Sequence, residues 1–366
     1  MPTSPPEQAN FGLLDVKLAF EWTRKNIAAF GGDPEKITLF GESAGAIIVD
    51  FLYLTTPSSK PPFRGVIMQS GSYYLNDNGI GLLGPQTGGN QTRMQQLSML
   101  AGCGYDDNTL ACLRSMPGAY LVLMADALNI AWSPLADGGS TVPLNMAGNK
   151  IRLSGGGARV PTLLGTNADE AIIFLAFGAP VTFQSLVNST FPELAPYEAQ
   201  IRAAYPIGGC SPTGCWTNEL DAASQAATDY LFNCPAAREA RATAQSGVPV
   251  WRYYFNRTTV ELYPTLPEYV THMAEMSLVF GTYKDNVTAN DKATSAFMMK
   301  AWTDFAKNPT AGPGWNAFTG ATSRNEIAQL GGPSNPNGRF DTNVTVIDYA
   351  CHIYEPIYNK RDPPKR

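Results

Sequence analysis

Residues 37–45 read ITLFGESAG, and this stretch decides the fold that the sequence predicts. Residues 37–40 have strand character, residues 41–45 form a Gly-x-Ser-x-Gly motif, and a helical pattern runs from Ala44 to about Leu54. A strand, a tight turn and a helix in this order provide the context that a nucleophile elbow requires. The two glycines let neighbouring chain segments approach closely, and the serine is held in a strained backbone region. We therefore expect the Ser43 hydroxyl to stand above the carboxyl end of a sheet as a nucleophile.

Length and composition favour one large domain. The chain has 366 residues, of which 44% are hydrophobic, and it shows neither an internal repeat nor a low-complexity linker. We therefore expect a single domain over residues 1–366. The net charge is −5 and no basic cluster is interleaved with aromatic residues, so nucleic-acid binding is not indicated. No apolar run reaches the ~18 residues of a membrane helix, so stable membrane insertion is not indicated either. The sequence indicates no particular oligomeric state.

Sequons and cysteines favour a secreted glycoprotein with disulfides. Asn-x-Ser/Thr sequons begin at Asn90, Asn188, Asn256, Asn286 and Asn343, and the cysteine count of six is even. Residues 1–10, MPTSPPEQAN, have neither the charged region nor the apolar region of a signal peptide. This mismatch predicts that the chain lacks its original front end.

The hydrophobic pattern alternates between helix and strand, which predicts an α/β fold with a mostly parallel sheet. We expect helices over residues 13–30, 44–54, 273–280 and 291–307, helical pieces over 91–123 and 182–245, and a terminal helix toward Tyr358. We expect strands over residues 37–40, 64–69, 160–165, 248–255, 327–330 and 344–347. Residues 72–89, 132–143 and 210–215 are predicted loops. Residues 155–157 are three glycines, but they lack the Lys-Ser/Thr ending of a phosphate loop and precede a strand.

A serine nucleophile needs a base, and the chain offers only two histidines. His272 lies in a loop after a predicted strand, whereas His352 lies in the terminal segment and is expected to be structural or exposed. A carboxylate must orient the base, and the order serine, acid, histidine is that of α/β-hydrolases. Asp169 and Glu170, shortly after the strand that ends at Gly165, are both candidates for the acid.

Several blocks of the chain resemble the type-B carboxylesterase family, which includes fungal lipases, cholinesterases and the non-catalytic neuroligins. The similar blocks are residues 10–22, 26–34, 40–45, 68–72, 134–138, 165–170, 229–235, 272–281 and 302–309. The resemblance covers nearly the whole chain, and its first block is far more specific than the pentapeptide alone. It implies an α/β-hydrolase fold with a mostly parallel central sheet flanked by helices.

The resemblance also implies an activity and a set of site residues. The activity is hydrolysis of carboxylic esters through an acyl-enzyme, on small-molecule or lipid esters, with no metal and no organic cofactor. The family signature makes Glu170 the acid and His272 the base, and the Ala44 N–H can supply one oxyanion-hole donor. Cys103 and Cys112 are nine residues apart and could be buried thiols, but their spacing is similar to a disulfide loop of the family's fungal lipases.

Departures from the family pattern lower the expected activity. Ala171 and Met273 stand where many members have glycine after the acid and after the histidine. The family's first strands, its Gly-Gly oxyanion loop and its lid all precede the block that begins here at Asn10. We therefore expect a fold that lacks the N-terminal strands and an impaired esterase. The alternative is a catalytically impaired or non-catalytic interaction protein of the neuroligin type.

Overall fold

The structure is a computed structural model that describes most of the chain. The described residues are 10–74, 87, 88, 91–128, 134, 141–143, 148–176, 181–212, 214–258, 265–284, 287–321, 325–331 and 339–361. The sequons at Asn90 and Asn286 and most of the loops predicted at 72–89 and 132–143 lie outside these ranges. Among the described residues, no helix combines the length and the apolar character needed to span a bilayer.

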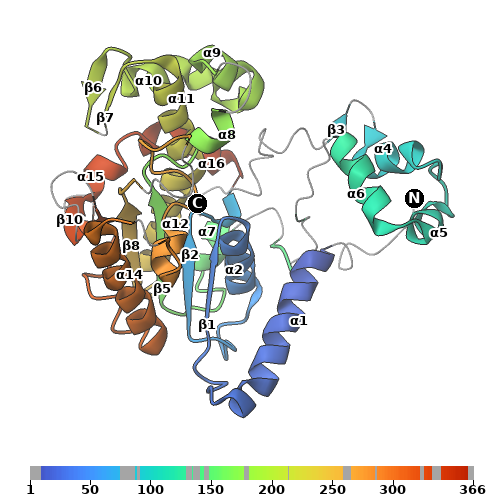
Figure 1. The fold of residues 1–366 in the computed structure, drawn as a ribbon, viewed down its shortest axis with the longest axis horizontal. Helices are drawn as coiled ribbons and strands as arrows, with labels where there is room; N and C mark the ends of the chain where they lie inside the picture. Colours follow the sequence, from blue (N-terminus) through green and yellow to red (C-terminus); the bar gives the residue numbers. More distant parts are fainter. Residues whose placement is uncertain are drawn as a thin grey trace.

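A six-stranded sheet forms the centre of the fold, in the order β1-β2-β5-β8-β9-β10 (Figure 1). The strands are β1 (Thr38–Glu42), β2 (Gly65–Gln69), β5 (Thr162–Asn167), β8 (Val250–Phe255), β9 (Asn325–Leu330) and β10 (Arg339–Asn343). The first five run parallel and β10 pairs antiparallel to β9. The predicted, mostly parallel α/β sheet is therefore confirmed.

The interior strands β2, β5 and β8 bury side chains on both faces. In β2, Val66 and Met68 face one core, while Ile67 between them faces the other. The first core packs against α2 (Ala44–Thr55), α11 (Glu219–Thr228), α12 (Cys234–Gln245) and α16 (Cys351–Arg361). The second packs against α13 (Met276–Phe280) and α14 (Ala289–Lys307). Burial on both faces explains why these strands have apolar runs instead of alternating patterns.

Helices follow β5 at the carboxyl end of the sheet. They are α8 (Ile172–Leu175), α9 (Phe183–Ser185), η5 (Leu186–Thr190), η6 (Pro192–Tyr197) and α10 (Glu198–Ala204). The hairpin β6 (Gly209–Ser211) and β7 (Gly214–Trp216) packs beside them (Figure 1). A loop was predicted here, but Cys210 and Cys215 lie opposite each other in the hairpin and form a disulfide. Only pairing in three dimensions distinguishes such a short hairpin from a loop.

Three short helices form a unit apart from the sheet (Figure 1). They are α4 (Arg93–Leu100), α5 (Thr109–Ser115) and α6 (Gly118–Ala127), beside the two-residue strands β3 (Thr87–Gly88) and β4 (Gln91–Thr92). Their own small core contains Leu97, Met124 and Ala125. The disulfide Cys103–Cys112 joins α5 to the segment after α4, where the sequence predicted a small closed loop. Another short helix, α7 (Gly148–Leu153), precedes β5.

The first helix ends as predicted but buries little. The helix α1 (Phe11–Asn26) continues as a 3-10 turn, η2 (Ile27–Phe30), and Gly31 ends it in the left-handed conformation with φ 81°. The sequence places Leu18 and Trp22 on one apolar face of this helix, but Leu18 is 65% exposed and Trp22 is 58% exposed. Strand β1 lies at the edge of the described sheet, and its Phe40 is 46% exposed. The described part of the chain therefore leaves an apolar surface and a strand edge uncovered.

In the C-terminal half, one prediction is wrong and another is correct only in part. Residues 344–347 were predicted as a strand, but they form α15 (Val344–Ile347). Asn343 begins this helix, because its side chain accepts a hydrogen bond from the Thr345 N–H at 2.9 Å. The helix predicted over 273–280 is shorter, since a turn precedes α13.

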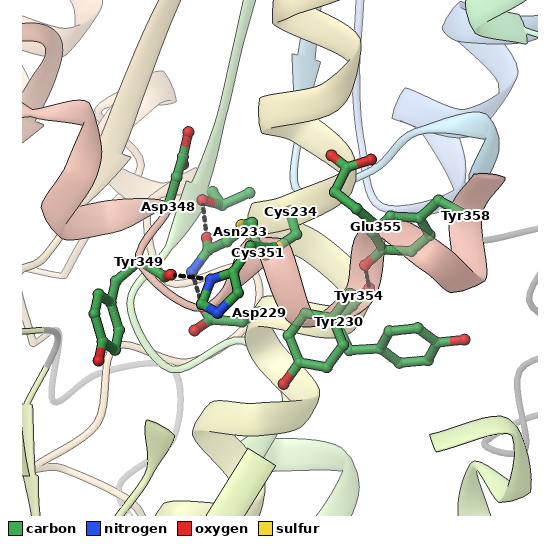
Figure 2. The surroundings of a disulfide bond; sticks show 12 residues. Asp229, Tyr230, Asn233, Cys234, Asp348, Tyr349, Cys351, Tyr354, Glu355 and Tyr358 are labelled. Atoms are coloured by element: carbon green, nitrogen blue, oxygen red, sulfur yellow. Dashed lines mark hydrogen bonds between the residues drawn. A yellow bond between two sulfur atoms is a disulfide. The ribbon is translucent and has the colours of Figure 1, made fainter. Parts of the chain in front are cut away.

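A third disulfide joins distant parts of the chain. Cys234 at the start of α12 bonds to Cys351 at the start of α16, across a sequence separation of 117 residues. Figure 2 shows this bond beside Asp229 and Asn233, which belong to the π-helical turn η7 (Asp229–Asn233). Asn233 donates a hydrogen bond to Asp229 at 2.6 Å and accepts one from Thr166 at the end of β5. The disulfide therefore fixes α16 against the turn that supports the end of β5.

Removal of this disulfide is expected to destabilise the protein strongly. The double variant Cys234→Ala/Cys351→Ala should lose about 5 kcal/mol of unfolding free energy, because the bond closes a loop of 117 residues. The control Cys210→Ala/Cys215→Ala opens a separation of only 5 residues and should lose about 2 kcal/mol. Urea unfolding measures both. An equal loss in the two variants would contradict the expectation.

Candidate active site

Ser43 stands at a sharp turn between β1 and α2. Its backbone has φ 54° and ψ −119°, a conformation that a residue with a side chain rarely adopts. A Cβ at Gly41 would lie 2.4 Å from the carbonyl carbon of Gly45, and one at Gly71 would lie 2.4 Å from the Ser43 carbonyl oxygen. A Cβ at Gly45 would meet no described atom within 4 Å. The close approach predicted for both glycines of the motif is therefore found at Gly41 but not at the second glycine. A second close approach to the turn occurs at Gly71, outside the motif.

The structure brings His272 and Glu170 together. The Nδ1 atom of His272 lies 2.6 Å from Oε2 of Glu170, although the residues are 102 positions apart in the sequence. Both side chains are buried, and the other Glu170 oxygen accepts a hydrogen bond from the Asn167 N–H at 2.7 Å. These two contacts orient the imidazole through a carboxylate that is itself held by the backbone.

Asp169, the other candidate acid, faces away from the histidine. Its Oδ2 atom accepts a hydrogen bond from the Val270 N–H at 2.8 Å. Burial raises the pKa of Asp169 to about 6, while the Val270 hydrogen bond opposes this rise. Asp169 therefore joins the turn after β5 to the loop that carries His272. The second histidine, His352, is exposed and contacts the Tyr349 carbonyl at 2.9 Å, as its sequence position suggested.

The second nitrogen of the imidazole lies close to a carboxyl that was not among the predicted site residues. The Nε2 atom of His272 lies 3.2 Å from Oε1 of Glu42, the residue before Ser43. Among the described residues, neither atom has a hydrogen-bond partner, so Ser43 does not hold Nε2 here. The side chain of Glu42 is 8% exposed. Burial raises the pKa of Glu42 to about 8; His272 lowers it, and the charges of Glu275 and Glu170 raise it further.

A third carboxyl, Glu275, completes the acidic surroundings of the base. Glu275 is fully buried and accepts hydrogen bonds from Gln69 at 2.8 Å and from Asn167 at 2.7 Å. Burial, together with the charge of Glu170, raises its pKa. The sequence did contain a signal that Glu275 lies near His272, because Glu275 follows it by three residues in the same turn. Glu42 could have been found in the same way, as the direct neighbour of Ser43.

Opposing effects set the pKa of His272. Burial alone would lower it, but the hydrogen bond to Glu170 and the charges of Glu170, Glu42 and Glu275 raise it above its usual value of 6.5. Two phenylalanine rings also flank the imidazole, because the ring centres of Phe174 and Phe232 each lie 5.2 Å from it. The ring is thus confined by aromatic contacts and by carboxyls at both nitrogens.

The turn η7 packs against His272 and lies beside the segment that follows Glu170. It supplies Phe232, and the preceding residue, Thr228, accepts a hydrogen bond from the Ala171 N–H at 3.0 Å. π-Helical turns are rare, and those that occur are often found at functional sites. The segment that follows Glu170 is therefore fixed to the element that packs on His272. Ala171, which departs from the family's glycine, is fully buried at this contact.

Met273, the other departure, adopts the conformation that suits glycine. Its φ is 68° and its side chain is 39% exposed. A residue with a Cβ pays a steric cost in this region, whereas glycine does not. The positive φ of Met273 strains its own backbone, and we expect this strain to lower the stability of the turn.

Replacement of Met273 by glycine is expected to stabilise the protein. Met273→Gly should raise the unfolding free energy by about 0.5 kcal/mol or more, because relief of the left-handed strain outweighs the added chain entropy. The control Ala296→Gly, on the exposed side of α14, should lose about 1 kcal/mol. Urea unfolding of both variants gives the comparison. A loss of stability in Met273→Gly similar to that of the control would contradict this account.

Comparison with known proteins places this geometry in a family. A model of the carboxylesterase family matches residues 6–342. The chain is 31% identical to a cholinesterase of Mus musculus over 356 residues, which is 87% of this chain and 56% of the relative. It is 30% identical to secreted lipase 5 of Gibberella zeae over 340 residues, 88% of this chain and 56% of that relative. The chain thus spans about half the length of these curated relatives. The match confirms the resemblance and the α/β-hydrolase fold: the chain belongs to the carboxylesterase family.

Proposed function

We propose that the chain is a serine hydrolase of carboxylic esters with Ser43 as nucleophile, His272 as base and Glu170 as the acid that orients the base. The observation that carries this proposal is the buried 2.6 Å contact between His272 Nδ1 and Glu170, beside a serine at a strained strand–helix turn. The membership of the family supports ester chemistry in general. Small-molecule or lipid esters are the proposed substrates.

The reaction follows from the roles of these atoms. Ser43 Oγ attacks the ester carbonyl carbon while its proton passes to His272 Nε2, and the carbonyl electron pair moves onto oxygen. The oxyanion accepts a hydrogen bond from the Ala44 N–H, which as the first amide of α2 has no partner within the helix. Collapse of this intermediate expels the alcohol, which takes the proton from Nε2. Water then attacks the acyl-enzyme by the same route, and the acid and Ser43 are released.

Glu42 has a separate part in this proposal. His272 Nε2 faces Glu42 in the free chain, so it must leave this carboxyl before it can receive the Ser43 proton. Glu42 therefore favours the protonated, inactive form of the base, and it stabilises the imidazolium once the proton has been transferred. We propose it as a positioning residue that sets the pH range of the reaction.

An extracellular location is also proposed. The described residues contain three disulfides and no free cysteine, a pattern typical of oxidising compartments. One relative is named a secreted lipase. Glycosylation at the sequons stays a prediction. Of the described sequons, Asn188 is exposed, whereas the Asn343 side chain caps α15.

Covalent labelling with a fluorophosphonate tests the proposed nucleophile and acid. The wild type should be labelled at Ser43, Ser43→Ala should not be labelled, and Glu170→Gln should be labelled roughly 10³–10⁴-fold more slowly, since the imidazole loses its anionic partner. Intact-protein mass spectrometry follows the rate.

Ser70 is the matched control, because it also follows a strand and has a positive φ of 53°. Ser70→Ala should keep the wild-type labelling rate. If wild type and Ser43→Ala take up equal label, the hydrolase proposal fails, and a non-catalytic interaction protein of the same family becomes the better interpretation.

The pH dependence of labelling tests the part of Glu42. Because the neutral imidazole is the active form, labelling should slow as the pH falls through the raised pKa of His272. Since the pKa of Glu42 is about 8, Glu42 is only partly charged while His272 titrates; Glu42→Gln removes this partial charge, so it should lower the pKa of His272 and shift the acidic limb to lower pH by up to roughly 1 unit. The control Glu268→Gln changes an exposed residue in the loop that carries His272. It should leave the acidic limb of the pH profile in place. A limb that does not move in Glu42→Gln would remove Glu42 from the scheme.

A further inference from the structure

A cavity separate from Ser43 lies between the first helix and the end of the second. Its volume is about 250 Å³, and it is bounded by α1, the last turn of α2 and the segment that leads to β2. The apolar part of its lining includes Leu13, Phe51 and Leu52, of which Leu13 and Phe51 are buried in the first core. This volume lies just below the ~300–1,000 Å³ of pockets for drug-sized molecules, so the cavity suits a small ligand.

Two lysines line the same cavity. Lys17 comes from α1 and Lys60 from the segment after α2. Among the described residues, neither ammonium lies within 4.0 Å of a carboxylate, although Glu21 follows Lys17 by one helical turn. Two unpaired cations at one cavity stand out in a chain whose net charge is −5. Their electrostatic preference is for an anion.

Hydrogen bonds to the last carbonyls of α2 do not explain why the two lysines lie at this cavity. Cations near a helix C-terminus are often explained by hydrogen bonds to its last carbonyls. Here the Leu52 carbonyl accepts from the Thr56 N–H at 3.1 Å, and the Phe51 carbonyl accepts from the Thr55 hydroxyl at 2.7 Å. Among the described residues, neither lysine donates to these carbonyls. Within the described part of the chain, the two ammonium groups therefore remain available to a ligand.

We propose that this cavity binds a small amphiphilic carboxylate, with its alkyl chain on the apolar lining and its carboxylate between Lys17 and Lys60. The lining removes the alkyl chain from water, and two ammonium groups match the single negative charge and two oxygens of a carboxylate. The Thr56 hydroxyl, which also lines the cavity, can donate a further hydrogen bond. Neither Ser43 nor His272 takes part, so this site does not depend on the proposed hydrolysis.

Titration calorimetry with octanoate tests the proposal. Wild type and Ser43→Ala should bind octanoate with the same affinity, which weakens as salt is added. Lys17→Gln and Lys60→Gln should each weaken binding about three- to five-fold, as expected for exposed charge pairs, and the double variant should weaken it roughly ten-fold or more. Acetate, inorganic phosphate and 1-octanol should each bind at least about ten-fold more weakly than octanoate, because each lacks the chain or the charge.

The control is Lys36→Gln, since Lys36 is an exposed lysine that pairs with Asp33 far from the cavity lining. It should bind octanoate like the wild type, and all variants should unfold at the same urea concentration. Octanoate binding that is absent from the wild type, or equal in the double lysine variant, would overturn the proposal. Equal affinity for 1-octanol would show an apolar cavity without the proposed anion site.

Discussion

The contact between Glu170 and His272 is the interaction on which the site depends. A buried carboxylate is costly unless it is hydrogen-bonded, and Glu170 meets this condition through the Asn167 N–H and through His272 Nδ1. The contact joins the loop after β5 to the loop after β8. Since these strands are neighbours and parallel, their carboxyl ends lie at one edge of the sheet. The topology of the sheet thus brings together two residues that are far apart in the chain.

The electrostatic balance around His272 follows from the same contact. One imidazole lies among Glu170, Glu42 and Glu275, and all three carboxyls are largely removed from water. Burial disfavours their charged forms, while the histidine favours them. The pKa of His272 is therefore raised, and its Nε2 atom faces Glu42 instead of Ser43.

Local patterns predicted the fold well where one residue type enforces the backbone. Gly31 ends the first helix, and the elbow requires Gly41. Prediction failed where pairing or capping depends on distant partners. The hairpin at Cys210 and the helix after Asn343 have short, ambiguous sequences. The apolar face of α1 was recognised, but its exposure could be known only from what packs nearby.

The sequence by itself determined which residues are candidates, because the strand–turn–helix motif at Ser43, the preference for His272 over His352 and a short list of acids depend only on motif, chain order and a small number of candidates. Only the tertiary structure shows that Glu170 contacts His272 while Asp169 contacts the Val270 N–H, since both acids follow the same strand and differ in the direction of their side chains. It alone placed Glu42 at Nε2 and joined Cys234 to Cys351. Distances between side chains on different strands are set by the packing of the whole sheet, and no local pattern encodes them.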